Sequence, residues 1–86
     1  MSGAVDKLRG VLAELDQKTG ELAELKKAEL EAERDGFHGQ TVTEARQNAK
    51  FAAMPHTVEI IDVQADIDVL LRWRDYYTLL IERGLE

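Results

Sequence analysis

The chain has 86 residues, of which 44% are hydrophobic and 33% charged, and it contains no cysteine. A chain this short forms one small domain whose core supplies only about 3–5 kcal/mol, and it has no disulfide or thiolate zinc site to strengthen it. Seventeen acidic residues against eleven basic ones give a net charge of −6, which argues against nucleic acid or an anionic membrane surface as the main partner.

The N-terminal residues do not have the pattern of a signal peptide. The sequence MSGAVD lacks a basic region followed by an apolar one, so no signal peptide is expected. Nowhere is there an apolar run of about 18 residues, so no transmembrane helix is expected either. The absence of cysteine fits a reducing compartment, and we therefore expect a cytoplasmic protein without a bound cofactor.

A first helix is predicted over residues 4–35, with Ser2 as its N-cap. Leu8, Leu15 and Leu22 repeat at strict sevens, as in the seam of a coiled coil. Glu29 takes the next place in that series, so the seam is expected to weaken there. The apolar residues recur at three- and four-residue steps: Val5, Leu8, Val11, Leu12, Leu15, Leu22, Leu25 and Leu30.

A turn is predicted over residues 36–42 and a short helix over residues 43–54. Gly36 is favoured just past a helix end, and Phe37 can pack back on the last turn. Thr41 and Glu44 have the spacing of a capping box. Pro55 ends or kinks the short helix, because proline has no N–H to donate and disfavours a helical residue before it.

The final helix is predicted over residues 57–83, with Thr57 as its N-cap and Gly84 at its C-terminal end. A β interpretation competes with it, because apolar residues alternate from Val63 to Trp73. We favour a helix because this segment has about 27 residues without a turn signal, whereas strands usually have 3–10.

The final helix is apolar on two faces. At about 100° per residue, one stripe contains Ile60, Val63, Ile67, Leu70, Leu71, Tyr77 and Ile81, and the other Val58, Val69, Trp73, Tyr76 and Leu80. A helix with two apolar faces needs two neighbours, and this chain supplies only one long partner helix. The second neighbour is therefore expected to be another molecule, a second copy first of all.

Aromatic and basic residues near the end of this helix are the best candidates for a binding surface. Trp, Tyr and Arg are the residues most enriched at interface hot spots, and Trp73, Tyr76 and Tyr77 lie beside Arg72 and Arg74. The alternative is that part of this group is core against the first helix. The predicted interface residues are Val58, Ile67, Val69, Trp73, Tyr76, Tyr77 and Leu80.

Residues suited to catalysis are few. His38 and His56 lie in predicted turns without metal-motif spacing, and the only serine, Ser2, lies at the terminus. Glu59, Asp62 and Asp66 share one face of the final helix. They are typical of a solvated first turn that is stabilised by the helix dipole, although such carboxylates also bind magnesium.

One resemblance to an enzyme family rests on these carboxylates. KTGELAELKK (residues 18–27), followed by EIID (residues 59–62), resembles the all-alpha nucleotide pyrophosphohydrolases, magnesium enzymes with EExxE and ExxD motifs. The resemblance implies Glu21, Glu59 and Asp62 as metal ligands, with Glu24 less closely matched. The chain departs from the family at Gln17-Lys18, where the first motif opens with two glutamates.

A second resemblance covers nearly the whole chain. A first helix rich in Leu, Glu and Ala, the segment TVTEARQNA (residues 41–49) and a final helix with Ala, Asp, Leu and Arg resemble small helical-hairpin proteins of actinobacterial bacteriophages. Those proteins are mostly without assigned function. The likeness implies a phage-encoded accessory protein in the bacterial host cytoplasm.

The sequence therefore predicts a single all-α domain, an antiparallel helical hairpin with a short extra helix at the bend, assembled into an oligomeric bundle. Its predicted function is non-catalytic: self-association and binding of a protein partner. The alternatives are the magnesium-dependent pyrophosphohydrolase and an accessory role on DNA, which would need a basic patch of Arg46 and Lys50, with Arg72 and Arg74.

Overall fold

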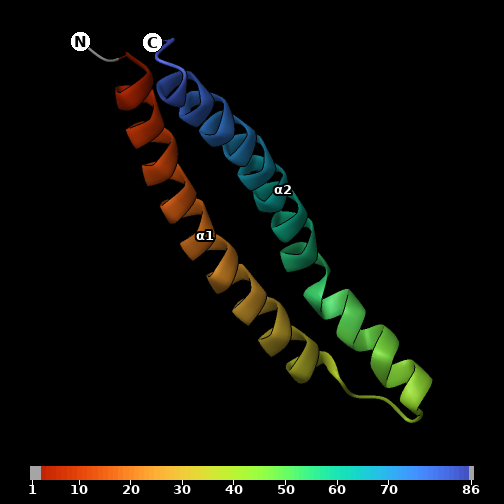
Figure 1. The fold of residues 1–86 in the computed structure, drawn as a ribbon. Coiled ribbons are helices and arrows are strands. Elements are labelled where there is room, and N and C mark those ends of the chain that lie inside the picture. Colours follow the sequence, from red (N-terminus) through yellow and green to blue (C-terminus); the bar gives the residue numbers. More distant parts are fainter. Residues whose placement is uncertain (1–2, 86) are drawn as a thin grey trace.

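The computed structural model describes residues 3–85 as two long helices that lie side by side and antiparallel (Figure 1). Helix α1 spans Gly3–Gly36 and helix α2 spans Val42–Glu82. The hairpin measures 65 × 16 × 14 Å. The predicted all-α antiparallel hairpin is confirmed, and the strand interpretation of residues 63–73 is wrong. Ser2, the predicted N-cap of the first helix, lies outside the described residues.

The two helices pack through a continuous seam. On α1, the buried or half-buried residues alternate at three- and four-residue steps from end to end, as in a coiled coil. The residues at these steps are Ala4, Leu8, Val11, Leu15, Lys18, Leu22, Leu25, Glu29, Ala32 and Gly36, and Val5, Ala28 and Glu33 beside them are also half-buried. The opposing residues of α2 include the predicted first stripe, with Ile60 and Val63 buried. The line of buried and half-buried residues continues through Glu29, which is itself half-buried.

Two polar residues of α1 lie within this apolar seam, and each has a partner on α2. The Nζ atom of Lys18 lies 3.2 Å from Oδ2 of Asp66. The hydroxyl of Thr57 donates a hydrogen bond of 2.5 Å to Oε2 of Glu29. Both pairs fix the register of α1 against α2, because sliding one helix by one turn along the other would separate the paired side chains. A polar seam position of this kind specifies alignment at some cost in stability.

The Lys18–Asp66 pair makes the hairpin sensitive to alkali. The hydrogen bond to Asp66 and the nearby charge of Glu21 raise the pKa of Lys18. A lysine with a raised pKa stabilises the fold while it is charged, and this contribution is lost as the pH rises above the ordinary pKa of lysine and through the raised pKa of the folded state.

We therefore expect Lys18→Met to reduce the loss of thermal stability between pH 9 and 12. Melting curves of both proteins at several alkaline pH values measure this difference, because the two chains differ only at position 18. If the two pH profiles coincide, the ion pair contributes nothing to folding.

The predicted break at Pro55 is wrong. Helix α2 continues through Pro55, so there is no separate short helix at the bend, and Thr57 is not an N-cap. Its hydroxyl instead reaches Glu29 and lies 3.2 Å from the carbonyl of Ala53. An interior proline costs about 3 kcal/mol. Here Ala53 before it and Ile60 after it are both buried against the same α1, and this packing keeps the two halves aligned.

The predicted cap at Thr41 and the predicted C-terminal turn at Gly84 are confirmed. The Thr41 side chain caps α2, because its Oγ1 accepts a hydrogen bond of 3.1 Å from the backbone N–H of Glu44. At the other end, Gly84 adopts a positive φ of 66°. The N–H of Leu85 donates to the carbonyl of Leu80 over 2.8 Å, which closes the last turn.

Small residues let the helices approach closely at the bend. The α2 residues that face α1 there are Ala45, Ala49 and Ala53, all buried. Gly36 ends α1 as predicted, and a Cβ atom on it would lie 2.6 Å from the Cβ of Ala52. Glycine is therefore required here for close contact. Phe37, predicted to pack on the last turn of α1, is instead more than half exposed.

Candidate interaction surface

The side of α2 that faces away from α1 carries a second line of apolar residues. This outer stripe consists of Phe51, Met54, Val58, Ile61, Ala65, Val69, Trp73, Tyr76 and Leu80, at steps of three and four residues. At about 100° per residue its centre lies roughly 160° around α2 from the seam. All its members are exposed except Leu80, which is half-buried. The outer stripe is unusually long for a surface of one small chain.

The residues predicted as interface from the sequence fall into two groups. Val58, Val69, Trp73 and Tyr76 are exposed on the outer stripe. Ile67 and Tyr77 are half-buried and belong to the seam stripe, while Leu80 is half-buried on the outer stripe. Their role in an interface stays a prediction.

Four members of the outer stripe are not predicted from the sequence. The sequence places Phe51 and Met54 in a separate short helix and puts Ile61 and Ala65 in neither stripe. All four are exposed. Met54 and Phe51 lie seven and ten residues before Ile61, which is a helical spacing, but only a helix that continues through Pro55 puts them in line with Val58 and Trp73.

An aromatic cluster forms the C-terminal part of this surface. The rings of Trp73 and Tyr77 stack with centroids 5.6 Å apart, and those of Trp73 and Tyr76 meet edge-on at 5.8 Å. Trp73 and Tyr77 also line a hollow against Val11 and Gly10 of α1. The cluster thus belongs partly to the hairpin, while Trp73 and Tyr76 remain open to a partner. It combines a large apolar area with few rotatable bonds, as interface hot spots do.

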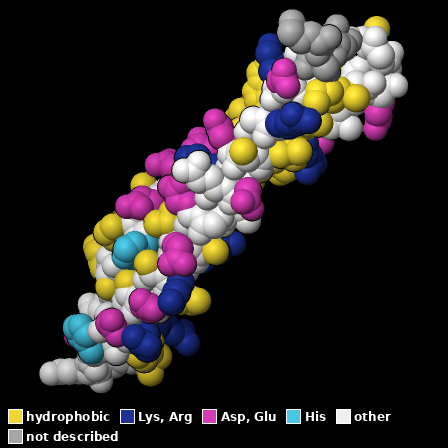
Figure 2. Space-filling model, turned by 90° about the vertical axis from the view of Figure 1, so that its left-hand side faces the viewer, with side chains coloured by type: hydrophobic (Ala, Val, Ile, Leu, Met, Phe, Trp, Pro, Cys, Tyr) yellow, Lys and Arg dark blue, Asp and Glu magenta, His cyan; other side chains and the backbone are white. Residues whose placement is uncertain are grey.

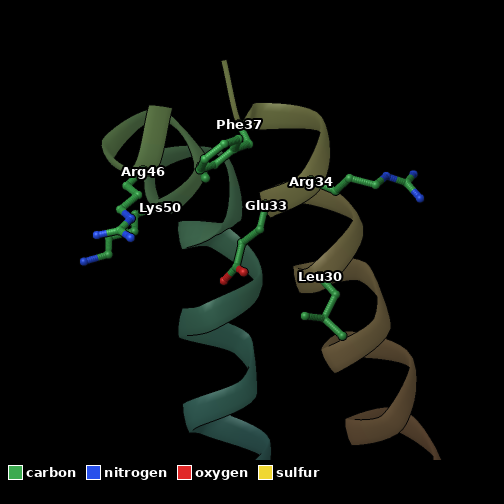
Figure 3. A pocket seen from close by; sticks show the side chains of 7 residues that line it. Leu30, Glu33, Arg34, Phe37, Arg46 and Lys50 are labelled. Atoms are coloured by element: carbon green, nitrogen blue, oxygen red, sulfur yellow. The ribbon is translucent and has the colours of Figure 1, made fainter. Parts of the chain in front are cut away.

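A hollow of about 520 Å³ lies at the bend, between the two helices (Figure 3). Leu30, Phe37 and Ala49 form its apolar wall. Glu33 extends into the space between the helices, whereas Arg34 points away on the α1 side and Arg46 and Lys50 extend from α2 in the opposite direction. Because the basic groups do not converge with this carboxylate, the hollow lacks the few directed polar contacts typical of a small-molecule site.

The carboxylates of the enzyme resemblance do not come together as a metal site. Among residues 3–85, no three Asp, Glu or His side chains are placed to hold a metal ion, so Glu21, Glu59 and Asp62 do not form such a group. Lys18 lies instead between Glu21 at 3.8 Å and Asp66 at 3.2 Å. Glu24, Glu59 and Asp62 are exposed.

The basic residues considered for DNA do not form one patch. Arg46 and Lys50 lie near the bend, and Arg72 follows about 39 Å further along α2, beyond the acidic Glu59 and Asp62. Arg74 is half-buried and paired with Asp75 at 2.9 Å. Figure 2 shows acidic side chains among hydrophobic ones along the face that it draws.

Comparison with protein-family models, with curated protein sequences and with solved structures gave no match. No described helix combines the length and the apolar character that crossing a bilayer requires. A function proposed for this chain therefore has to be based on the helical hairpin and its outer stripe.

Proposed function

We propose that this chain is a non-catalytic oligomerising module that associates with itself through the outer stripe of α2 and presents the assembled bundle to another protein. The proposal is based on the observation that α2 is apolar on two opposite sides over most of its length, while α1 covers only one of these sides. Burying a Leu, Ile or Phe side chain contributes about 1.5–3 kcal/mol. Leaving the outer stripe in water would forgo several kcal/mol in a domain that has little to spare.

The bend of the hairpin presents basic and apolar side chains that support the second part of this proposal, a protein partner. Arg46 and Lys50 at the bend make no ion pair within residues 3–85 and flank exposed Phe37. A surface of this kind suits an acidic, apolar segment of another protein. The resemblance to phage hairpin proteins adds a host or phage protein as the partner that we propose.

The mass in solution tests the self-association. Light scattering on a sizing column, over a concentration series, is expected to give a dimer or larger species. Trp73 is the only tryptophan, so its emission should shift to longer wavelength when dilution separates the copies. A monomer of 9.7 kDa at every concentration, with unchanged emission, would refute the proposal.

A further inference from the structure

We infer that the second copy binds antiparallel, with α2 against α2, about a two-fold axis at the level of Ile67. This inference rests on the proposed self-association and gives it an orientation and a register. The inference is based on the order of charged and apolar residues along the outer stripe. When a second stripe lies antiparallel to the first, opposite charges face each other and apolar residues face apolar residues.

Only two charged residues lie within about 60° of the centre of the stripe, between Phe51 and Leu80. They are Asp62 and Arg72, ten residues apart and opposite in sign. Both are exposed, and neither makes an ion pair or side-chain hydrogen bond within the described part of the chain. The hairpin alone thus leaves both charges without a partner.

The direction of the second helix decides what these charges meet. In a parallel, in-register pair, Asp62 faces Asp62 and Arg72 faces Arg72, and like charges in contact disfavour that pairing. In an antiparallel pair about the level of Ile67, Asp62 faces Arg72 of the second copy. Symmetry repeats this contact, so each dimer gains two ion pairs at its interface. The charges therefore select the antiparallel orientation.

The same axis also matches the apolar residues. From Met54 to Leu80, about 39 Å of helix, each apolar member of the stripe lies level with an apolar member of the second copy. Small Ala65 lies opposite Val69, next to the axis. The remaining pairs are Ile61 with Trp73, Val58 with Tyr76, and Met54 with Leu80.

The register with the axis two residues further along α2 fits less well. Moving the axis to the level of Val69 places Asp62 against Tyr76 of the second copy. It also directs Arg72 toward Asp66, which is already paired with Lys18 at 3.2 Å within its own hairpin. The register at Ile67 is thus the one that pairs both free charges, as polar residues at helix interfaces commonly do to fix alignment.

Disulfide cross-linking tests the orientation, because the native chain has no cysteine. Val58→Cys and Tyr76→Cys chains are prepared separately, mixed and oxidised gently, and the products are identified by mass. In the proposed dimer the mixed 58–76 disulfide forms. The 58–58 and 76–76 disulfides do not, because those pairs are about 27 Å apart, well beyond the reach of a disulfide. Leu12→Cys on α1, mixed with Tyr76→Cys, is the control that should not cross-link.

Each outcome is informative. Disulfides of 58 with 58 and of 76 with 76 would show a parallel pair and overturn this inference while leaving self-association intact. A dimeric mass without the mixed disulfide would also overturn it. A monomeric mass would remove the proposed function along with it.

Charge reversal provides a second, independent test. Asp62→Arg is expected to raise the dissociation constant of the dimer about tenfold or more, because it faces Arg72 at both symmetric contacts. Arg72→Asp should do the same, and the double variant should restore the native value. Failure of the double variant to restore association would contradict the pairing of these two residues.

Discussion

Trp73→Ala is expected to dissociate the assembled protein while leaving most of the helical structure in place. Trp73 is 48% exposed in the hairpin, and it lies in the aromatic cluster of the outer stripe. Truncating an interface hot spot costs about 2 kcal/mol or more for each copy. A symmetric dimer loses this contact twice, so its dissociation constant should rise by about two to three orders of magnitude. Sedimentation equilibrium measures the dissociation constant, and circular dichroism measures the helix content.

A matched control comes from α1. Leu12 is 47% exposed but lies off the outer stripe, so Leu12→Ala should leave the mass unchanged. Ile61→Glu, on the outer stripe and about 18 Å along α2 from Trp73 of its own chain, should dissociate the protein as Trp73→Ala does. If Trp73→Ala instead lowers helicity and association in equal measure on dilution, then Trp73 is ordinary core of the hairpin.

Much of the hairpin is predictable because its seam follows a simple period. Leu8, Leu15 and Leu22 define the face of α1, and Ile60 and Val63 lie on the predicted stripe of α2. Helix ends that are marked by capping residues, such as Thr41 with Glu44, can be predicted equally well, because capping depends on residues a few positions apart in the sequence. These features need no knowledge of the partner helix.

Features that depend on the partner helix were missed. Pro55 reads as a break in isolation, but burial of Ala53 and Ile60 against α1 overrides the local preference. From the sequence, Glu29 is expected to interrupt the seam. In the structure, the hydroxyl of Thr57 on the opposite helix donates a hydrogen bond to the Glu29 carboxylate. Because a break at Pro55 separates the two segments, the sequence alone predicts that the second stripe begins at Val58, whereas the outer stripe begins at Phe51.

Gly36→Ala is expected to destabilise the hairpin, although alanine is the better helix former. A Cβ atom at this position would lie 2.6 Å from the Cβ of Ala52 and 3.1 Å from the carbonyl oxygen of Asn48. The latter is a backbone atom, so α2 itself would have to move. Overpacking of this kind costs about 1–3 kcal/mol, a large share of the stability of so small a domain. Urea unfolding followed by circular dichroism measures the change.

Gly20→Ala is the matched control, because a Cβ atom on Gly20 meets no atom within 4 Å. It should stabilise the protein by up to about 1 kcal/mol, so the same substitution at two sites on α1 changes the free energy of unfolding in opposite directions. Adding Ala52→Gly to Gly36→Ala should recover part of the loss, and a double-mutant cycle isolates that coupling. If Gly36→Ala stabilises the protein as Gly20→Ala does, the helices do not approach closely at the bend. The small side chains of Ala45, Ala49 and Ala53 would then have no role in bringing the helices together.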